Sequence, residues 1–260
     1  MNRLLPLFRT ALFVAACAAV LAARPAAAAE IRVLSAGAVE PGLRPALRAF
    51  EQTTGHRVAL QFATAPQIAQ RTDAADAFDI VIAPALGLDG LQAASALRSE
   101  RARRVPIGSV GIGVAVRPGA PVPDLSSTES FTRALLEADS LAYNRASTGL
   151  WFEGVLQRLG LTERLAAKTQ RFDDGAAVMR HVLNGRGREI GVGATTEILL
   201  LREQGLQLVG PLPASMQNRT TYIAAPTAAS PPPEVDALMQ HLDAAATRAG
   251  FVAAGIEPAR

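Results

Sequence analysis

Three short segments of small and hydroxyl-bearing residues stand out as places where an anion could bind. They are Ser35 to Ala38, Ala63 to Pro66 and Ala146 to Gly149, and each follows an apolar run and precedes a segment of helical periodicity. The first backbone N–H groups of a helix have no partner within the helix, and the helix dipole makes its start partly positive. An oxyanion or carboxylate binds at such a start, and nearby hydroxyls can donate further hydrogen bonds.

Each of these residues also has a purely structural interpretation. A Ser or Thr before a helix commonly caps it, so a single hydroxyl does not identify a ligand site. The pair Asp173 and Asp174 is better interpreted as a cap for the helix that begins at Gly175. Arg145 is equally consistent with a charged clamp on the ligand and with an ordinary surface residue. Three such junctions in one chain nevertheless favour a shared site.

The elements that must position these junctions alternate along the chain. Short runs rich in Val, Ile and Leu alternate with longer amphipathic segments, which predicts an α/β protein with mostly parallel strands. Ligands of such proteins bind at the carboxyl ends of the strands. The predicted strands are Ile31–Ser35, Arg57–Ala63, Ile80–Ala83, Gly108–Val116, Ser140–Asn144 and Ile190–Ala194.

The helical segments carry apolar residues at three- to four-residue spacing, which predicts faces that pack into a core. The predicted core positions are Leu43, Leu47, Phe50, Val155, Leu156, Leu159, Val178, Val182 and Leu183. Two proline-rich stretches, Pro118–Pro123 and Ala229–Pro233, resemble connections between larger units.

The first 29 residues are expected to be a signal peptide. Arg3 and Arg9 precede an apolar run of about a dozen residues, and Ala27 to Ala29 form a small-residue cleavage site. Export to the periplasm is therefore expected, with Glu30 as the first mature residue. The alternative is a lipoprotein anchored at Cys17, because Val14 to Cys17 resembles the motif that precedes a lipid-modified cysteine.

Charge and cysteine content exclude several classes of function. Removing residues 1–29 takes away three arginines and no acid, so the 26 basic and 23 acidic residues of the full chain become 23 of each. A mature chain without net charge gives no support for a nucleic-acid partner. Cys17 is the sole cysteine, so the mature chain has no thiol nucleophile and no cysteine-based metal site. We expect no cofactor.

Several motifs together resemble one family of exported proteins. Ile31 to Val39 is followed by a helix ending in Phe50-Glu51 and by Thr54-Gly55. Further along come Phe78 to Ala83, Asn144 to Gly149 and Asp174 to Gly193. Their order and spacing are similar to those of the molybdate-binding family of type II periplasmic binding proteins, the solute-binding components of ABC transporters. The resemblance extends from about Ile31 to Phe251.

This resemblance implies two α/β lobes joined by two crossing segments, with a ligand cleft between them. Lobe 1 would comprise residues 30–108 and 226–260, and lobe 2 residues 109–225. The partners implied are a small anionic ligand and an ABC permease in the inner membrane, with the binding protein acting as a monomer. Junctions and resemblance together give the candidate ligand-binding residues: Ser35, Gly37, Ala38, Thr64, Ala65, Ala83, Arg145, Ser147, Thr148, Gly149 and Thr195.

The ligand itself is left open between two classes. The molybdate binders usually have a serine where this chain has Ala38, a Ser-Ser pair where it has Thr64-Ala65, and a tyrosine where it has Gly193 to Thr195. A molybdate-like oxyanion is the first expectation. A small carboxylate held by Arg145 and hydroxyls, for uptake or sensing, is the alternative.

A periplasmic enzyme is the weaker third hypothesis. The three histidines, His56, His181 and His241, do not form the H-E-x-x-H spacing of a zinc enzyme. The chain also lacks the G-x-S-x-G motif of a serine hydrolase. The sequence therefore predicts a binding protein that carries out no catalysis.

Overall fold

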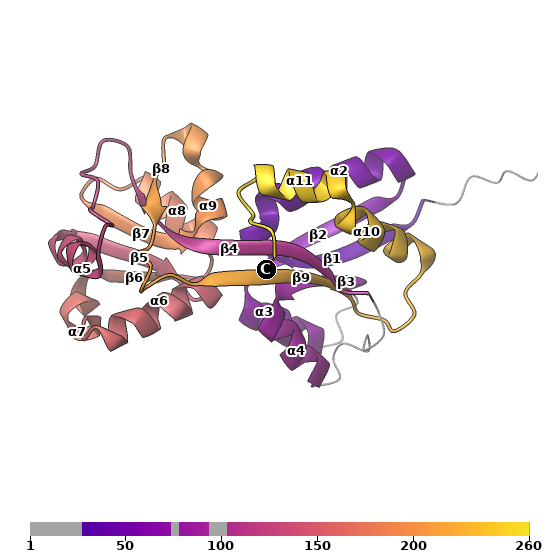
Figure 1. Ribbon diagram of the computed structural model, residues 1–260, viewed down its shortest axis with the longest axis horizontal. Coiled ribbons are helices and arrows are strands. Elements are labelled where there is room, and N and C mark those ends of the chain that lie inside the picture. Colours follow the sequence, from indigo (N-terminus) through magenta and orange to yellow (C-terminus); the bar gives the residue numbers. More distant parts are fainter. Residues whose placement is uncertain (1–27, 74–77, 94–102, 260) are drawn as a thin grey trace, which may run out of the picture.

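Two β-sheets with helices on both faces make up the computed structural model, which describes residues 28–73, 78–93 and 103–259. Figure 1 shows two α/β bodies side by side, joined by the strands β4 and β9. The predicted signal peptide, including Cys17, lies outside the described residues except at Ala28 and Ala29.

The first sheet has the strand order β2-β1-β3-β9-β4. Its strands are β1 (Glu30–Ala36), β2 (Arg57–Ala63), β3 (Ile80–Pro84), β9 (Arg219–Pro226) and the first part of β4 (Val105–Val116). β1 pairs in parallel with β2 and β3, and β9 runs antiparallel between β3 and β4.

Helices cover both faces of this sheet. A 3₁₀ turn η1 (Gly37–Val39) leads into α2 (Glu40–Thr54), which packs on one face with α10 (Pro233–Asp243) and α11 (Ala245–Ala253). The other face carries α3 (Ala65–Asp73) and α4 (Ala85–Ala93) (Figure 1). The buried faces form one apolar core, in which Leu43, Leu47 and Phe50 are at most 4 % exposed, as their spacing predicts.

The second sheet has the order β4-β7-β5-β6, with β8 on the other edge of β4. Its further strands are β5 (Ser140–Asn144), β6 (Thr169–Phe172), β7 (Glu189–Ala194) and β8 (Gln207–Pro211). One face is covered by α5 (Thr128–Glu137), α6 (Ser147–Arg158), α7 (Thr162–Leu165) and η2 (Ala166–Lys168). The other face is covered by α8 (Gly175–Leu183), α9 (Thr195–Leu199) and η3 (Arg202–Gln204).

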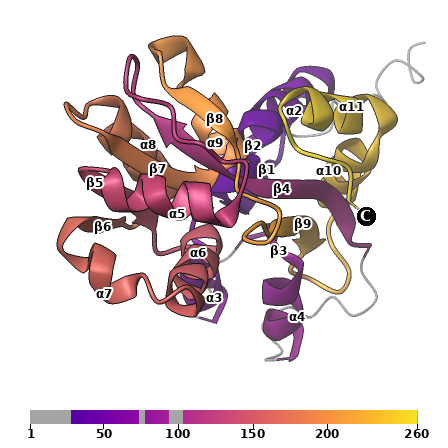
Figure 2. The same ribbon diagram turned by 60° about the vertical axis from the view of Figure 1, so that its left-hand side comes forward.

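β4 belongs to both sheets. Its residues 105–111 pair with β9 in the first sheet, and residues 112–116 pair with β7 and β8 in the second. At the change of partner, the side-chain amide of Gln217 accepts the N–H of Ile112 at 2.8 Å and donates to its carbonyl oxygen at 2.9 Å. Figure 2 shows the two sheets turned relative to each other about this strand. The lobe boundaries at residues 108 and 225 stay a prediction.

The expected α/β architecture is correct, but the expectation of mostly parallel strands is wrong. Four of the eight strand pairings are antiparallel, and all four involve β4 or β9. β6, β8 and β9 were not predicted. β6 and β8 are only four and five residues long and lack a long apolar run, and β9 begins with Arg219 and two threonines.

Two other expectations also fail. The proline-rich stretches lie between β4 and α5 and between β9 and α10, so each connects elements of the same body. The chain passes between the two bodies within the strands β4 and β9, and these strands are not proline-rich. Leu159, predicted to face the core, is 38 % exposed, because α6 ends at Arg158 and Leu159 lies beyond its last turn.

Candidate functional site

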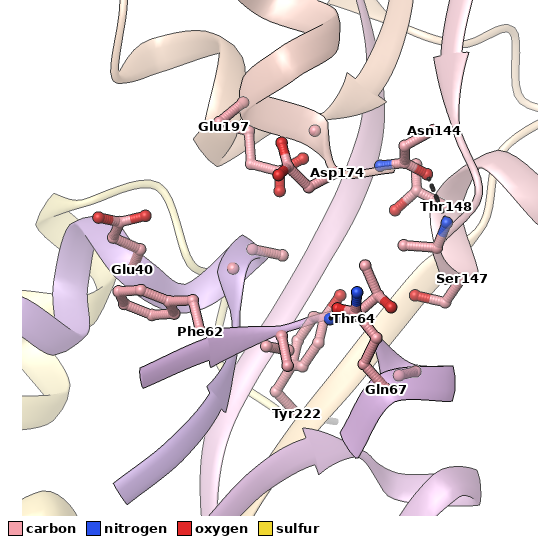
Figure 3. A pocket seen from close by; sticks show the side chains of 18 of the residues that line it. Glu40, Phe62, Thr64, Gln67, Asn144, Ser147, Thr148, Asp174, Glu197 and Tyr222 are labelled. Atoms are coloured by element: carbon pink, nitrogen blue, oxygen red, sulfur yellow. Dashed lines mark hydrogen bonds between the residues drawn. The ribbon is translucent and has the colours of Figure 1, made fainter. Parts of the chain in front are cut away.

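A cavity of about 200 Å³ lies between the two sheets, at the carboxyl ends of their parallel strands. Its lining includes the last residues of four strands: Ala36 of β1, Ala63 of β2, Pro84 of β3 and Asn144 of β5. Because parallel strands end at one edge of each sheet, the junctions that follow them converge here. Figure 3 shows the polar side chains of this cavity.

On the side of the second sheet, the cavity meets the start of α6. The residue before this helix is Ala146, which offers no side chain to cap it. Asn144 Oδ1 accepts the N–H groups of Ala146 at 3.1 Å and Gly149 at 3.0 Å. The N–H groups of Ser147 and Thr148 have no acceptor in the described part of the chain, and both residues line the cavity. This helix start can therefore bind an anion.

Opposite α6 lie two junctions of the first sheet. Gly37 and Ala38 line the cavity where β1 ends, and no side chain caps η1. At the end of β2, the Thr64 N–H donates to Gln67 Oε1 at 2.9 Å, as in a capping box. The Thr64 hydroxyl remains directed towards Ser147 and Thr148 across the cavity (Figure 3).

Three carboxylates also line the cavity: Figure 3 shows those of Glu197 and Asp174 next to each other and that of Glu40 farther away, near Phe62. Asp174 caps α8, its Oδ1 accepting the Ala177 N–H at 2.7 Å. Glu40 pairs with Arg44 at 2.6 Å. Glu197 accepts the backbone N–H of Ala194. Burial, with the charges of Asp174 and Glu40, raises the pKa of Glu197 to about 7.

Two further side chains complete the lining. Arg180 of α8 lines the cavity, and its guanidinium has no hydrogen-bond or ion-pair partner among the residues described. Tyr222 of β9 is 2 % exposed, and its hydroxyl hydrogen-bonds with the Ser147 side chain across the two bodies. Burial raises the pKa of Tyr222, so the phenol stays protonated at neutral pH.

The structure brings together six of the eleven candidate residues around this cavity. They are Gly37, Ala38, Thr64, Ala65, Ser147 and Thr148. They come from all three of the junctions that the sequence singles out.

The other five candidates do not line the cavity. Ser35 is fully buried and donates to the Ala36 carbonyl oxygen, and Ala83 is buried within β3 just before Pro84. Gly149 lies one residue too far into α6, where its N–H is bound by Asn144. Thr195 begins α9, and a Cβ added at Gly113 would lie 3.0 Å from its methyl group.

Arg145 lies at the surface and outside the lining of the cavity. Its side chain is 56 % exposed, donates to the Arg171 carbonyl oxygen at 2.8 Å and lies 3.6 Å from Asp173. The cation that does line the cavity is Arg180, five residues after Gly175 on α8.

Several lining residues were missed from the sequence: Glu40, Phe62, Gln67, Asn144, Arg180, Glu197 and Tyr222. Gln67 carried a usable signal, because it stands three residues after Thr64, and a Gln at that spacing reaches back to the start of a helix. Glu197 carried no such signal, because the residue three positions before it is Ala194. Tyr222 could not be found this way, because the strand that carries it was not predicted.

The described part of the chain shows neither a metal-binding cluster nor a membrane-spanning helix. Within residues 28–73, 78–93 and 103–259, no three His, Cys, Asp or Glu side chains are grouped so as to hold a metal ion. None of the helices in these ranges has the length and apolar character needed to cross a membrane.

Comparison with known proteins gives one relative of nearly equal length. It is an aconitate isomerase from Pseudomonas sp., 30 % identical over 254 residues, and the alignment covers 93 % of this chain and 94 % of the relative.

Solved structures match the fold at lower identity. The periplasmic molybdate-binding protein of Azotobacter vinelandii superposes with a TM-score of 0.71 at 16 % identity, covering 88 % of this chain and all of that one. The substrate-binding domain of a molybdenum ABC transporter of Clostridium difficile gives 0.63 at 14 % identity, covering 90 % and 100 %. The expected type II periplasmic binding fold is thereby confirmed.

The family is established by the sequence itself. The model of the bacterial extracellular solute-binding proteins matches residues 31–257, almost all of the chain beyond the predicted signal peptide. With its two bodies, its shared cavity and this match, the chain belongs to the family of bacterial extracellular solute-binding proteins.

Proposed function

We propose that the mature protein captures a small anion between its two lobes and delivers it to an ABC permease in the inner membrane. One observation carries this proposal. The free N–H groups of Ser147 and Thr148 and the hydroxyls of Thr64, Ser147 and Thr148 face a cavity whose lining also includes Arg180, an exposed arginine whose guanidinium has no partner among the described residues. Free amides, hydroxyls and a guanidinium are all donors, so an anion is the ligand that they favour.

The ligand class that the cavity favours is an organic acid with two or more carboxylates. Its volume of about 200 Å³ is many times the roughly 10–15 Å³ that a cavity needs to hold one water molecule, which leaves room for a ligand with several functional groups. One carboxylate would bind at Ser147 and Thr148, and a second near Arg180. The relative named for an activity on aconitate, a tricarboxylate, supports this class.

A tetrahedral oxyanion such as molybdate is the second candidate ligand. It is favoured by the free N–H groups of Ser147 and Thr148, which approach a ligand without intervening side chains. The alanines at positions 38 and 65 provide no hydroxyls, so fewer donors surround a small oxyanion.

Capture would proceed by closure of the two lobes. A ligand that contacts both lobes favours the closed arrangement by its differential affinity, through bending of β4 and β9. We propose that the protein acts as a monomer in the periplasm, without chemical conversion of its ligand. The closed form would then dock on the permease.

Isothermal titration calorimetry of residues 30–260 tests this function. We expect citrate, tricarballylate or succinate to bind at least about tenfold more tightly than molybdate, sulfate or phosphate, a difference of about 1.4 kcal/mol. A higher affinity for molybdate would select the oxyanion instead. If every one of these anions fails to bind at millimolar concentration, the proposed function is wrong.

A second candidate function is isomerisation of the bound acid. It is favoured by Glu197, which lines the cavity with a pKa near neutrality as a general acid–base residue requires, and by the relative named aconitate isomerase. Incubation with cis-aconitate and with trans-aconitate, followed by chromatography, distinguishes the two functions. Conversion by the wild type that is lost in a Glu197→Gln variant would establish catalysis, and unchanged isomers would favour capture alone.

A further inference from the structure

The packing around Glu197 places its carboxylate on the wall of the cavity. It is the third residue of α9, and its carboxylate accepts the Ala194 N–H, which is one half of a capping box. A Cβ at Gly175 would overlap the carboxylate, and one at Gly37 would lie 3.3 Å from its Oε1. The carboxylate therefore lies between the start of α8 and the junction after β1, on the wall of the cavity.

The charged groups around Glu197 leave it as the uncompensated acid of the site. Asp174 is bound by the Ala177 N–H at the start of α8, and Glu40 is paired with Arg44. Tyr222 faces it from β9 as a protonated phenol. Among the described residues, Glu197 has no ion-pair partner, and the Ala194 N–H donates to its carboxylate. Arg180 lines the same cavity.

An arriving anion changes which form of this acid is stable. A second negative charge beside a buried carboxylate disfavours the ionised form, as it does for any pair of acids that share a site. The protonated form has one oxygen to accept the Ala194 N–H and one O–H group to donate into the cavity. Binding an anion therefore favours the acid over the carboxylate.

We propose that Glu197 is a specificity-determining residue that binds the ligand in its protonated form, donating an O–H hydrogen bond to an ionised carboxylate of the ligand. This inference rests on the proposed function and deepens it. It predicts that capture of one ligand takes up one proton from solvent at the pH where free Glu197 is ionised. It also predicts selection for ligands whose second polar group is an acceptor, against those with an amino group there.

The test is calorimetry with tricarballylate, which has no double bond to isomerise and no hydroxyl group. Wild-type protein is titrated at pH 6, 7 and 8 in two buffers of different ionisation enthalpy. We expect uptake of about one proton at pH 8 and an affinity that falls about tenfold per pH unit above 7. The control is Glu197→Gln, whose amide can accept from Ala194 and donate to the ligand at every pH.

The Glu197→Gln variant should bind within about threefold of the wild type at pH 6, with no proton uptake and no pH dependence. A Glu197→Ala variant lacks the donor and should bind about tenfold more weakly at pH 6. Circular dichroism of each variant checks that the fold is kept.

The outcomes separate this inference from the proposed function. Binding of tricarballylate without proton uptake, or a pH dependence that persists in Glu197→Gln, contradicts the inference alone. Absence of binding by tricarballylate and by every other anion at all three pH values contradicts both. Tighter binding of an amino dicarboxylate such as glutamate at pH 8 would show that Glu197 binds its ligand as a carboxylate, which also overturns the inference.

Discussion

At the scale of single residues, Asn144 makes the start of α6 available to a ligand. Its Oδ1 binds the N–H groups of Ala146 and Gly149, so it caps the helix from the strand that precedes it. A Ser or Asp at the N-cap would instead bind an N–H of the first turn and place its own oxygen in the cavity. With Ala146 there, the donors of Ser147 and Thr148 remain for a ligand.

Replacing both Ser147 and Thr148 by Ala tests whether these two residues donate hydrogen bonds to the ligand. We expect the affinity for the bound anion to fall by at least about 1 kcal/mol, because two hydroxyl donors to a charged group are lost. Calorimetry with the tightest-binding anion measures the change. Ser230→Ala removes a hydroxyl from an exposed loop residue and is the control. An affinity equal to that of the control would remove both hydroxyls from the site.

The raised pKa of Glu197 also predicts how stability depends on pH. Its pKa in the folded chain is about 7, against 4.5 as the ordinary value. Between these values the unfolded chain is ionised at this residue while the folded chain keeps its proton. The free energy of unfolding therefore falls as pH rises from 4.5 to 7 and is constant for this group beyond.

Glu197→Gln should remove this decline. The variant is expected to be more stable than the wild type at pH 8 by about 2 kcal/mol, after a reduction for solvent in the cavity, and to lose the advantage near pH 4. Urea denaturation of both proteins at several pH values measures the difference. A difference that does not change with pH would mean that the folded chain ionises Glu197 normally.

At the scale of elements, the sheet-to-helix junctions are what the sequence could predict. Six of the eleven candidate residues line the cavity, because small residues and hydroxyls between a strand and a helix are recognisable without a structure. Tyr222 and Arg180 were not recognisable. Tyr222 lies on a strand of the first sheet that comes 135 residues after β3 ends, and only the antiparallel pairing with β3 and β4 brings it to the site.

Gly149 shows how tightly α6 is joined to β5. A Cβ there would overlap the carbonyl oxygen of Asn144, and the backbone has little room to move. Gly149→Ala should therefore destabilise the fold by about 3 kcal/mol. Gly154→Ala in the same helix meets the Arg158 guanidinium at an ordinary 3.5 Å and should stabilise by about 0.5–1 kcal/mol. Thermal denaturation of both measures this contrast, and equal melting temperatures would refute it.

At the scale of the whole molecule, the two bodies are joined by strands and also touch beside the cavity. The Thr196 hydroxyl of α9 donates to the Ala38 carbonyl oxygen at 2.6 Å, and this bond is buried. The Tyr222 hydroxyl meets Ser147 on the other side. These contacts were not predictable from the sequence, because each joins residues that are distant in the chain and belong to different sheets.

Thr196→Val should shift the balance between the closed and open arrangements. It removes the bond to Ala38 while keeping the side-chain volume, so we expect the affinity for ligand to fall about fivefold, close to 1 kcal/mol. Small-angle scattering of the ligand-free variant should give a larger radius of gyration. Thr169→Val breaks a hydroxyl-to-carbonyl bond to Leu165 within one body and should change stability but not affinity. Equal effects of the two variants on affinity would contradict this role.

The place of β9 in the first sheet determines the order in which the molecule can fold. Until residues 219–226 have been synthesised, β3 keeps a free edge, and α10 and α11 are not yet present to cover the sheet. The second sheet has all its strands by residue 211. A nascent chain can thus consolidate the second sheet first, while β3, which already pairs with β1, lacks its second neighbour until β9 follows more than a hundred residues later. Such distant pairings are slow to form, so we expect the first sheet to be the last part of the molecule to complete its folding.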